Sequence, residues 1–321
     1  MDNNPISVIM SMYREEPEHL KLAVESVLNQ TYKDFEFIII ADDPCNKKLI
    51  DIIEDYQKKD SRIHFFVNSK NMGAAMSRNR ALFMCKGKYV AIMDADDVCD
   101  ISRLEDQISY FNKNKHVDVV FSGRTDIDEK GNVINPFKSR VLSENSIKEM
   151  LKYCDIITNP VVMAKTDVLK ELGGMRSVEC AEDYDLWLRC VSNGYKIHYI
   201  NKSHLNYRIR RDSLSHGNYA RTWVGTKYAL KLFGQRQKTN VDSYSVEDFE
   251  NFVKHSILKN KKSTKRFNDA YKVYCNALDK KNKGKTMGAL LGVMHSVLIH
   301  FEILRVFVDS LLLKRCEKKQ S

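Results

Sequence analysis

The sequence predicts a doubly wound α/β domain that is followed by a basic helical tail. Three observations carry this prediction: four apolar runs of strand length in the first hundred residues, helical spacing of apolar residues between the runs, and acidic residues directly after several of them. Strands that alternate with helices are typical of a mostly parallel sheet with helices on both faces.

The four runs are Ile6–Met12, Phe35–Ala41, Ile63–Val67 and Tyr89–Met93. Their nearly continuous apolar character is expected of strands that are buried on both faces. The helical intervals are marked by Leu20, Val24, Val27 and Leu28, by Leu49, Ile52, Ile53 and Tyr56, and by Leu104, Ile108 and Phe111 after the fourth run.

Further elements follow from turn residues and periodicity. They are a loop or hairpin over Gly123–Ile134 that turns at Lys130-Gly131-Asn132, a short strand at Val161–Met163, a helix through Val168 and Leu169 that stops at Gly173-Gly174, and a helix over Glu182–Ser192 that stops at Gly194.

The composition is that of a globular protein, with 43% hydrophobic and 29% charged residues in a chain of 321. The net charge is +10, and residues 235–321 hold 18 Lys and Arg against 9 Asp and Glu. A nearly neutral catalytic domain over residues 1–234 is therefore expected before a basic helical region over residues 235–321. This distribution gives no whole-surface affinity for nucleic acid.

Eight cysteines are scattered without a C-x-x-C pair, which predicts free thiols rather than a zinc site or a disulfide framework. The segment Met1–Ile6 is polar and lacks the basic start and apolar core of a signal peptide. Both observations favour a cytoplasmic protein.

Acidic residues gather where the strands of the predicted sheet end. The second run is followed by Asp42-Asp43, the third by Asn71-Met-Gly73 and then Arg78, and the fourth by Asp94-Ala-Asp96-Asp97. Ligands of such sheets bind outside the carboxyl ends of the strands. No G-x-G-x-x-G follows the first strand, so the pattern favours a metal–diphosphate site over a dinucleotide site.

Two acidic pairs have both a chemical and a neutral interpretation. Asp94 and Asp96 project from one face of a strand and could hold a hard divalent cation, although a solvated acidic loop has the same sequence. Glu182 and Asp183 open a helix, where they could cap its positive end or supply a general base.

The order of the motifs decides between these interpretations, because it resembles glycosyltransferase family two, in particular its bacterial exopolysaccharide and O-antigen members. The resemblance covers about residues 5–215. It is carried by Ile6-Ser-Val-Ile-Met10, Ala23–Tyr32, Phe35–Ile39, Asn71–Asn79, Asp94-Ala-Asp-Asp97 and Glu182–Arg189.

The resemblance implies a GT-A fold, a UDP-sugar donor and inversion at the anomeric carbon. It also implies a role for each matching residue. Asp42 and Asp43 would hold the uracil and ribose, Arg78 would line the nucleotide pocket, Asp94 would face ribose and metal, Asp96 would bind Mn or Mg, Asp183 would be the catalytic base, and Glu182 would shape the acceptor site.

The chain departs from the family pattern at two places. Pro44-Cys45 stands where Gly-Ser is common, so the nucleotide loop is expected to follow another path. Tyr207-Arg-Ile-Arg210-Arg211 stands where Tyr-Arg-x-His is common. Arg210 and Arg211 could grip the diphosphate in place of a histidine metal ligand. A solvent-facing basic loop is the alternative.

The tail combines a basic segment, Lys259–Lys285, with an apolar one, Met287–Leu313. Apolar residues at helical spacing beside a narrow polar strip predict one amphipathic helix over Met287–Leu313. Its uncharged run, Thr286–Phe301, is shorter than the ~20 residues of a membrane span. We expect it to lie in the plane of the inner face of the cell membrane. The alternative is a helix packed on its own domain or on a partner chain.

These observations predict transfer of a sugar to a growing, lipid-linked glycan. Two other functions stay open at this point. A nucleotidyltransferase has a similar sheet but commonly a glycine-rich basic loop after the first strand, where this chain has Tyr13-Arg14-Glu15-Glu16. A catalytically silent binding protein is the other. No nucleic-acid partner is predicted, because the tail contains no recognised module.

Overall fold

The computed structural model describes residues 6–210 and 218–318, and its contacts divide the chain into two units. The first unit comprises residues 1–147, 156–177 and 186–210, and the second comprises residues 148–155, 178–185 and 211–321. This division differs from the predicted boundary at residues 234 and 235, which falls inside helix α9 (Tyr219–Thr239). The helix continues through Gly234 because one interior glycine costs only about 1 kcal/mol.

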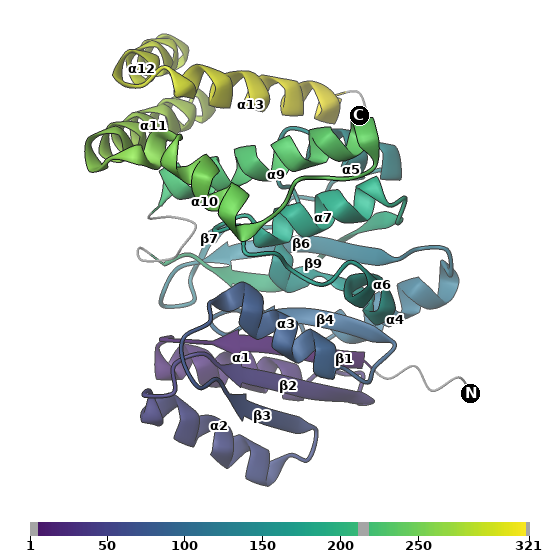
Figure 1. Ribbon diagram of the computed structural model, residues 1–321. Helices are drawn as coiled ribbons and strands as arrows, with labels where there is room; N and C mark the ends of the chain where they lie inside the picture. Colours follow the sequence, from purple (N-terminus) through teal and green to yellow (C-terminus); the bar gives the residue numbers. More distant parts are fainter. Residues whose placement is uncertain (1–5, 211–217, 319–321) are drawn as a thin grey trace. The chain divides into compact units, whose positions relative to one another are not determined.

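The first four strands of the first unit form the parallel part of its sheet (Figure 1). They are β1 (Ile6–Met12), β2 (Phe35–Ala41), β3 (Ile63–Val67) and β4 (Tyr89–Asp94), in the order β3-β2-β1-β4. The four predicted strands are confirmed, and only β4 is one residue longer than predicted. Nearly every side chain of β1, β2 and β4 is buried.

The remaining strands make the sheet a mixed one. They are β5 (Val98–Cys99), β6 (Val119–Ile127), β7 (Val133–Asn135), β8 (Met163–Lys165) and β9 (Ile197–Arg208). β8 runs antiparallel to β4 and to β6, β9 runs parallel to β6, and β5 and β7 pair antiparallel with β9 and β6. The first half of the sheet is therefore wholly parallel, whereas the second half combines the parallel pair β6 and β9 with antiparallel pairs.

The sequence made two predictions for the strands after β5, and their outcomes differ. The hairpin is confirmed as β6 and β7, with Gly131 at φ +89° in the turn between them. The strand predicted at Val161–Met163 is displaced, because Asn159–Val161 forms a 3₁₀ turn and β8 begins at Met163. Proline fits the first position of a helical turn, so Pro160 favours the turn over a strand.

Seven helices accompany the sheet among the described residues up to 210. They are α1 (Pro17–Leu28), α2 (Lys47–Lys59), α3 (Ala74–Met84), α4 (Arg103–Lys113), α5 (Glu144–Leu151), α6 (Thr166–Glu171) and α7 (Glu182–Ser192). The predicted helix Glu182–Ser192 is confirmed. Gly73, at φ +85°, turns the chain into α3 in a conformation that other residues rarely adopt.

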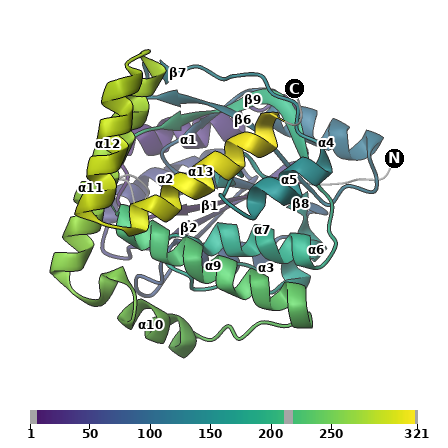
Figure 2. The same cartoon turned by 90° about the horizontal axis from the view of Figure 1, so that it is seen from above.

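The second unit contains α9, α10 (Val246–Lys254), the 3₁₀ turn Ile257–Lys259, α11 (Lys261–Asn282), α12 (Thr286–Ile299) and α13 (Glu302–Lys318). α11 and α12 run side by side (Figures 1 and 2). A buried apolar cluster holds α9, α11 and α13 together. It consists of Ala220, Phe267, Ala270, Tyr274 and Ile303.

The single amphipathic helix predicted over Met287–Leu313 is wrong in one respect, because the structure contains two helices there. His300 is extended, at φ −151° and ψ 117°, and separates α12 from α13. Neither proline nor glycine marks this break. Ile303 is fully buried in the apolar cluster, so tertiary packing of α13 decides where the helix is interrupted.

Candidate active site

Three neighbouring parallel strands of the first unit, β2, β1 and β4, end beside one another. The residue pair Asp42-Asp43 follows β2, the segment Arg14-Glu15 follows β1, and Asp94-Ala-Asp96 closes β4. Hydrogen bonds and ion pairs connect these loops. The carboxyl ends of the strands thus bring together the acidic residues that the sequence indicated.

The two aspartates after β2 have different surroundings. Asp42 is buried and accepts hydrogen bonds from the Asn68 side chain at 2.7 Å and from the backbone N–H groups of Met72 and Gly73 at 2.8 Å. Asp42 therefore holds the loop that leads into α3. The Asp43 side chain stays 14% exposed and pairs with the Nε atom of Arg14 at 3.1 Å. Asp43 is the more accessible of the two to a ligand.

The aspartates at the end of β4 each pair with an arginine. The Nη2 atom of Arg78, on α3, donates to Oδ1 of Asp94 at 2.6 Å. The Nε atom of Arg210 lies 2.8 Å from Oδ2 of Asp96. Two guanidinium groups thus offset charge on two carboxylates, and all four side chains keep between 13% and 29% of their surface exposed.

Burial and mutual repulsion act on the acids of this site. Burial, and then the negative charge of Asp94, raises the pKa of Asp96, whereas Arg210 opposes that rise. Burial likewise raises the pKa of Glu15, with a smaller contribution from Asp96. Oε2 of Glu15 accepts a hydrogen bond from the Tyr13 N–H at 2.8 Å. Such groups favour a bound cation, which would stabilise their charged forms.

Arg208 and Asp97 fix the turn behind Asp96. The backbone N–H of Arg208 donates to Oδ1 of Asp97 at 2.7 Å, and the Arg208 Nε atom donates to the carbonyl oxygen of Asp96 at 2.9 Å. Both side chains are buried, and burial raises the pKa of Asp97 well above its ordinary value. The turn that carries Asp96 is therefore held from the end of β9.

The donor set suits a divalent cation that is shared with a diphosphate. Within residues 6–210 and 218–318, no group of three or more His, Cys, Asp or Glu residues is placed to hold a metal ion. Asp94 and Asp96 nevertheless offer carboxylate oxygens, and Mg²⁺ is commonly bound by one or two carboxylates together with water and substrate phosphates. The chemistry of the site therefore fits such an ion.

Glu182 and Asp183 belong to the second unit, at the first turn of α7. Both are half-buried, whereas the next seven residues of the helix, Tyr184–Cys190, are buried. Oδ1 of Asp183 accepts a hydrogen bond from the Tyr184 N–H at 2.8 Å. The first turn thus presents the only acidic side chains of α7 that retain exposure, since Asp185 is fully buried.

The structure describes every predicted site residue except Arg211, which lies outside the described residues. It groups Asp42, Asp43, Arg78, Asp94, Asp96 and Arg210 in the first unit. The sequence reasoning missed Glu15 and Arg208. Both could have been found from the sequence. Glu15 follows the first strand, where ligand-binding residues are expected, and Arg208 is the arginine of the Tyr-Arg motif.

Comparison with known proteins identifies relatives over most of the chain. The family described as "Glycosyl transferase family 2" matches residues 7–173. An uncharacterized glycosyltransferase of Methanocaldococcus jannaschii, MJ1057, is 42% identical over 238 residues, which are 74% of this chain and 82% of that protein. The Escherichia coli enzyme WfaP, a UDP-Glc:α-D-GlcNAc-diphosphoundecaprenol β-1,3-glucosyltransferase, is 32% identical over 254 residues, which are 78% of this chain and 95% of WfaP.

Solved structures share the fold at low sequence identity. Residues 1–349 of S. aureus TarS in complex with UDP-GlcNAc match with a TM-score of 0.58 and 17% identity, over 98% of this chain and 90% of that one. The Pyrobaculum calidifontis mannosyltransferase PcManGT, in complex with GDP-Man and Mn²⁺, matches with a TM-score of 0.57 and 14% identity, over 98% and 86%. These likenesses and the mixed α/β sheet confirm the predicted GT-A fold.

Proposed function

We infer, from the premise that this chain belongs to glycosyl transferase family 2 and is a glycosyltransferase, that it moves a sugar from a UDP-sugar to a hydroxyl of a growing glycan. Family membership excludes the nucleotidyltransferase and the silent binding protein. One observation supports the UDP-sugar site above all others. Asp43 follows β2, and Asp94 and Asp96 close β4, at the carboxyl ends of the strands on either side of β1, and Arg78 and Arg210 pair with the two aspartates of β4.

Asp43 and Asp94 would recognise the nucleoside. The exposed edge of Asp43 can accept hydrogen bonds from the uracil N–H and from ribose hydroxyls, with Asp42 holding the adjoining loop. Arg78 keeps the carboxylate of Asp94 in place and leaves its other oxygen able to accept from ribose. Buried, oriented acceptors of this kind reject analogues that lack the matching donor.

Asp94 and Asp96 would hold Mn or Mg, and this ion would neutralise the charge that develops on the departing diphosphate. Arg210 pairs with Asp96 through its Nε atom. A guanidinium has five N–H donors, so the donors that do not contact Asp96 can bind phosphate oxygens. Arg211 would add a second donor. Arginine binds phosphate through parallel N–H bonds, which gives strength and direction to the contact.

Asp183 would act as the general base. Its carboxylate would take the proton of the acceptor hydroxyl while that oxygen attacks the anomeric carbon, and Glu182 would line the acceptor site. UDP leaves from the opposite face, so one displacement inverts the anomeric configuration and no enzyme nucleophile is needed. The positive end of α7 favours the charged form of a carboxylate in its first turn.

We propose that the acceptor glycan is linked to a lipid, and two observations support this proposal. The related WfaP acts on a glycan joined through diphosphate to undecaprenol. The second unit of this chain also exposes an apolar surface, with side-chain exposures between 43% and 81%. Its residues, called here the apolar surface, are Met287, Leu290, Leu291, Met294, Leu298, Phe301, Leu304, Val308 and Leu311.

The apolar surface is best suited to an anionic membrane. Within the second unit two polar residues of α13 make internal contacts: Asp309 pairs with Lys227 at 2.7 Å, and Ser310 accepts a hydrogen bond from Tyr274. On the same helix Ile303 is buried in the apolar cluster, whereas Leu304, Val308 and Leu311 are exposed, and exposed apolar residues in such number are typical of an interaction surface. The basic segment Lys259–Lys285 precedes it and would attract anionic headgroups. No helix among the described residues is long and apolar enough to cross a membrane. We propose that the apolar surface and the basic segment together hold the enzyme peripherally at the inner face of the cell membrane.

A donor screen tests the enzymatic proposal. Purified full-length protein is assayed with UDP-, GDP- and dTDP-sugars, Mn²⁺ and a short-chain GlcNAc-diphospho-lipid, with UDP-glucose as the first donor. We expect turnover with a UDP-sugar and a product of inverted configuration by NMR. Turnover confined to GDP- or dTDP-sugars would contradict the nucleotide assignment, and a product of retained configuration would contradict the mechanism.

A vesicle experiment tests the membrane proposal. Leu298→Glu combined with Phe301→Glu should abolish co-sedimentation with anionic vesicles, because two charges would enter the headgroup region. The matched control is Ile101→Glu, an exposed apolar residue of the first unit. High salt should weaken wild-type binding only in part, since salt screens charge but not apolar burial. The proposal would be overturned if the wild-type protein did not co-sediment with vesicles and instead formed dimers through the apolar surface.

A further inference from the structure

The segment that carries the proposed base is attached to helix α9. Residues 178–185, which include Glu182 and Asp183, are grouped by their contacts with residues 211–321 rather than with the sheet of the first unit. Three contacts along α9 account for this grouping. They involve Arg221, Gly225 and Arg236, which are spaced over most of the helix. The position of the base therefore depends on a helix that contributes no predicted site residue.

The first two contacts hold the approach to α7. Arg221 forms an ion pair with Glu179. Gly225 allows close packing, since a Cβ atom there would lie 2.4 Å from the carbonyl oxygen of Glu179 and 3.1 Å from the Cβ atom of Ala181. Cys180 lies between them at φ +62°, a left-handed conformation that residues other than glycine rarely adopt. Such backbone persists only where the surroundings hold it.

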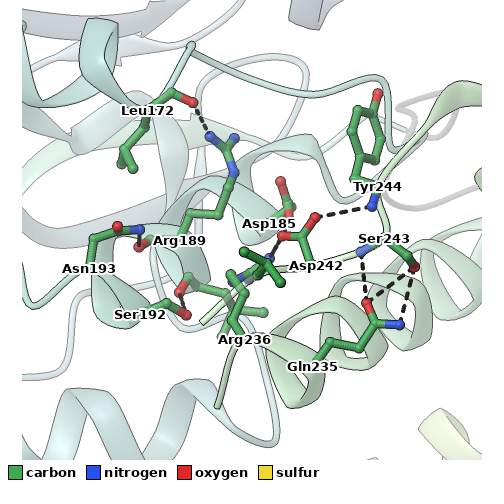
Figure 3. Close-up of polar contacts among 12 residues, drawn as sticks. Leu172, Asp185, Arg189, Ser192, Asn193, Gln235, Arg236, Asp242, Ser243 and Tyr244 are labelled. Carbon is green, nitrogen blue, oxygen red and sulfur yellow. Dashed lines mark hydrogen bonds and ion pairs between the residues drawn. The ribbon is translucent and has the colours of Figure 1, made fainter. Parts of the chain in front are cut away.

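The third contact lies inside the unit and joins three charged side chains (Figure 3). Arg236 places its Nη1 atom 2.5 Å from Oδ2 of Asp242 and 3.7 Å from Oδ1 of Asp185. The exposed fractions of Arg236, Asp185 and Asp242 side chains are 5%, 0% and 5%. Oδ1 of Asp242 also accepts from the Tyr244 N–H at 3.1 Å, which fixes Asp242 from the following loop.

The chemistry of Asp185 explains why this pairing matters for Asp183. Asp185 stands two residues after Asp183 in the same helical turn, so any shift of Asp185 moves Asp183 with it. A fully buried carboxylate such as that of Asp185 needs a partner. The guanidinium of Arg236 is such a partner, and Asp242 fixes its orientation. Arg236, held by Asp242, thus places a positive charge 3.7 Å from Oδ1 of Asp185, and this ion pair links the first turn of α7 to the end of α9.

We propose that Arg236 is a positioning residue for the base: by binding Asp185 and Asp242 it sets where the Asp183 carboxylate meets the acceptor hydroxyl. The inference rests on the proposed function, in which Asp183 takes the proton. Arg236 itself would contact neither the donor nor the acceptor. Displacement of a reacting group by about 1 Å can cost roughly 10²-fold in rate, so loss of the tie should slow transfer and spare donor binding.

The test compares full-length variants for turnover of UDP-glucose with the GlcNAc-diphospho-lipid, for manganese-dependent UDP affinity and for thermal unfolding. Arg236→Met should lower kcat by roughly 10-fold or more while UDP affinity stays within about 2-fold. Arg236→Lys should recover part of kcat, since the ammonium restores charge but not the planar fork. Lys238→Met, which removes a charge from the exposed face of the same helix, should behave as wild type.

A double variant separates positioning from simple neutralisation. Arg236→Met with Asp185→Asn neutralises Asp185 as well and leaves only Asp242 without its arginine, so its unfolding temperature should recover part of the loss seen in Arg236→Met. Its kcat should nevertheless stay at least ~10-fold low, because the ion pair between Arg236 and the first turn of α7 is absent. A double variant with wild-type kcat overturns the inference. Asp183→Asn serves as reference: if it transfers normally, the proposed base fails, whereas a slow Asp183→Asn beside a normal double variant means that only the role of Arg236 fails.

Discussion

The acidic motif at the end of β4 and the acidic motif at the start of α7 share one arrangement but are held differently. Each combines a partly exposed carboxylate with a buried one close by in sequence: Asp96 with Asp97, and Asp183 with Asp185. Asp97 is fixed by the backbone N–H of Arg208 at 2.7 Å. Asp185 is paired instead with the guanidinium of Arg236, 51 positions later in the sequence.

The difference follows from the two kinds of secondary structure. Asp97 directly precedes β5, which pairs with β9, so a backbone N–H of β9 can hold its carboxylate at little entropic cost. Backbone N–H groups inside a helix are already bonded, so a buried acid such as Asp185 must find a side chain from another element. The motif at the end of β4 is therefore supported by sheet backbone in addition to Arg78 and Arg210, whereas the first turn of α7 is supported through side chains of α9.

The largest expected effect concerns the strand-end motif. Asp96→Ala removes a carboxylate from the proposed cation site and should lower turnover of UDP-glucose by at least ~10³-fold, since the charge on the leaving diphosphate would be less well compensated. EDTA should abolish wild-type turnover, and Mn²⁺ or Mg²⁺ should restore it. Asp51→Asn, at an exposed aspartate of the same unit, is the matched control. Full activity in chelator would remove the metal from the proposal.

The corresponding change in the helix motif is Asp183→Asn. It keeps the shape of the side chain but cannot accept a proton, so transfer should fall by roughly 10²-fold or more. Manganese-dependent UDP affinity, measured by calorimetry, should stay unchanged, because the nucleotide residues belong to the strand ends. A variant with both normal transfer and normal UDP affinity would show that the base lies elsewhere.

Stability measurements probe the two buried acids directly. Arg236→Met removes the guanidinium beside the buried carboxylates of Asp185 and Asp242 and should cost about 3–5 kcal/mol in the free energy of unfolding. Asp97→Asn keeps the Oδ1 acceptor for the Arg208 N–H, and its effect should stay below about 1.5 kcal/mol. Urea titrations followed by circular dichroism give both values. Equal losses would mean that the two acids are supported alike.

The smallest effect is expected at Arg210. Arg210→Ala should weaken UDP binding by about 10-fold and leave uridine binding nearly unchanged, since only the diphosphate offers charged oxygens to a guanidinium. Calorimetry with both ligands at one Mn²⁺ concentration measures the difference. A matched loss for uridine and UDP would point to a disturbed Asp96 turn instead of a lost phosphate contact.

Much of the first unit could be predicted because its signals are local. Ile6–Met12, Phe35–Ala41 and Ile63–Val67 form strands with the predicted bounds, since buried parallel strands are continuous apolar runs between turns. The acids after them could be located because parallel strands end at one edge. The antiparallel pairing of β8 was not predictable, because it depends on which distant strand lies alongside it.

The sequence by itself determined the strand order along the chain, the acidic residues at the strand ends and the family resemblance, because periodicity and short motifs are local properties. The tertiary structure alone decided the break between α12 and α13 at His300, which follows from burial of Ile303 and from no local helix breaker. It also decided that Asp185 meets Arg236 and Asp242. Charged residues far apart in sequence become partners only after folding has buried them together, since burial makes the pairing necessary.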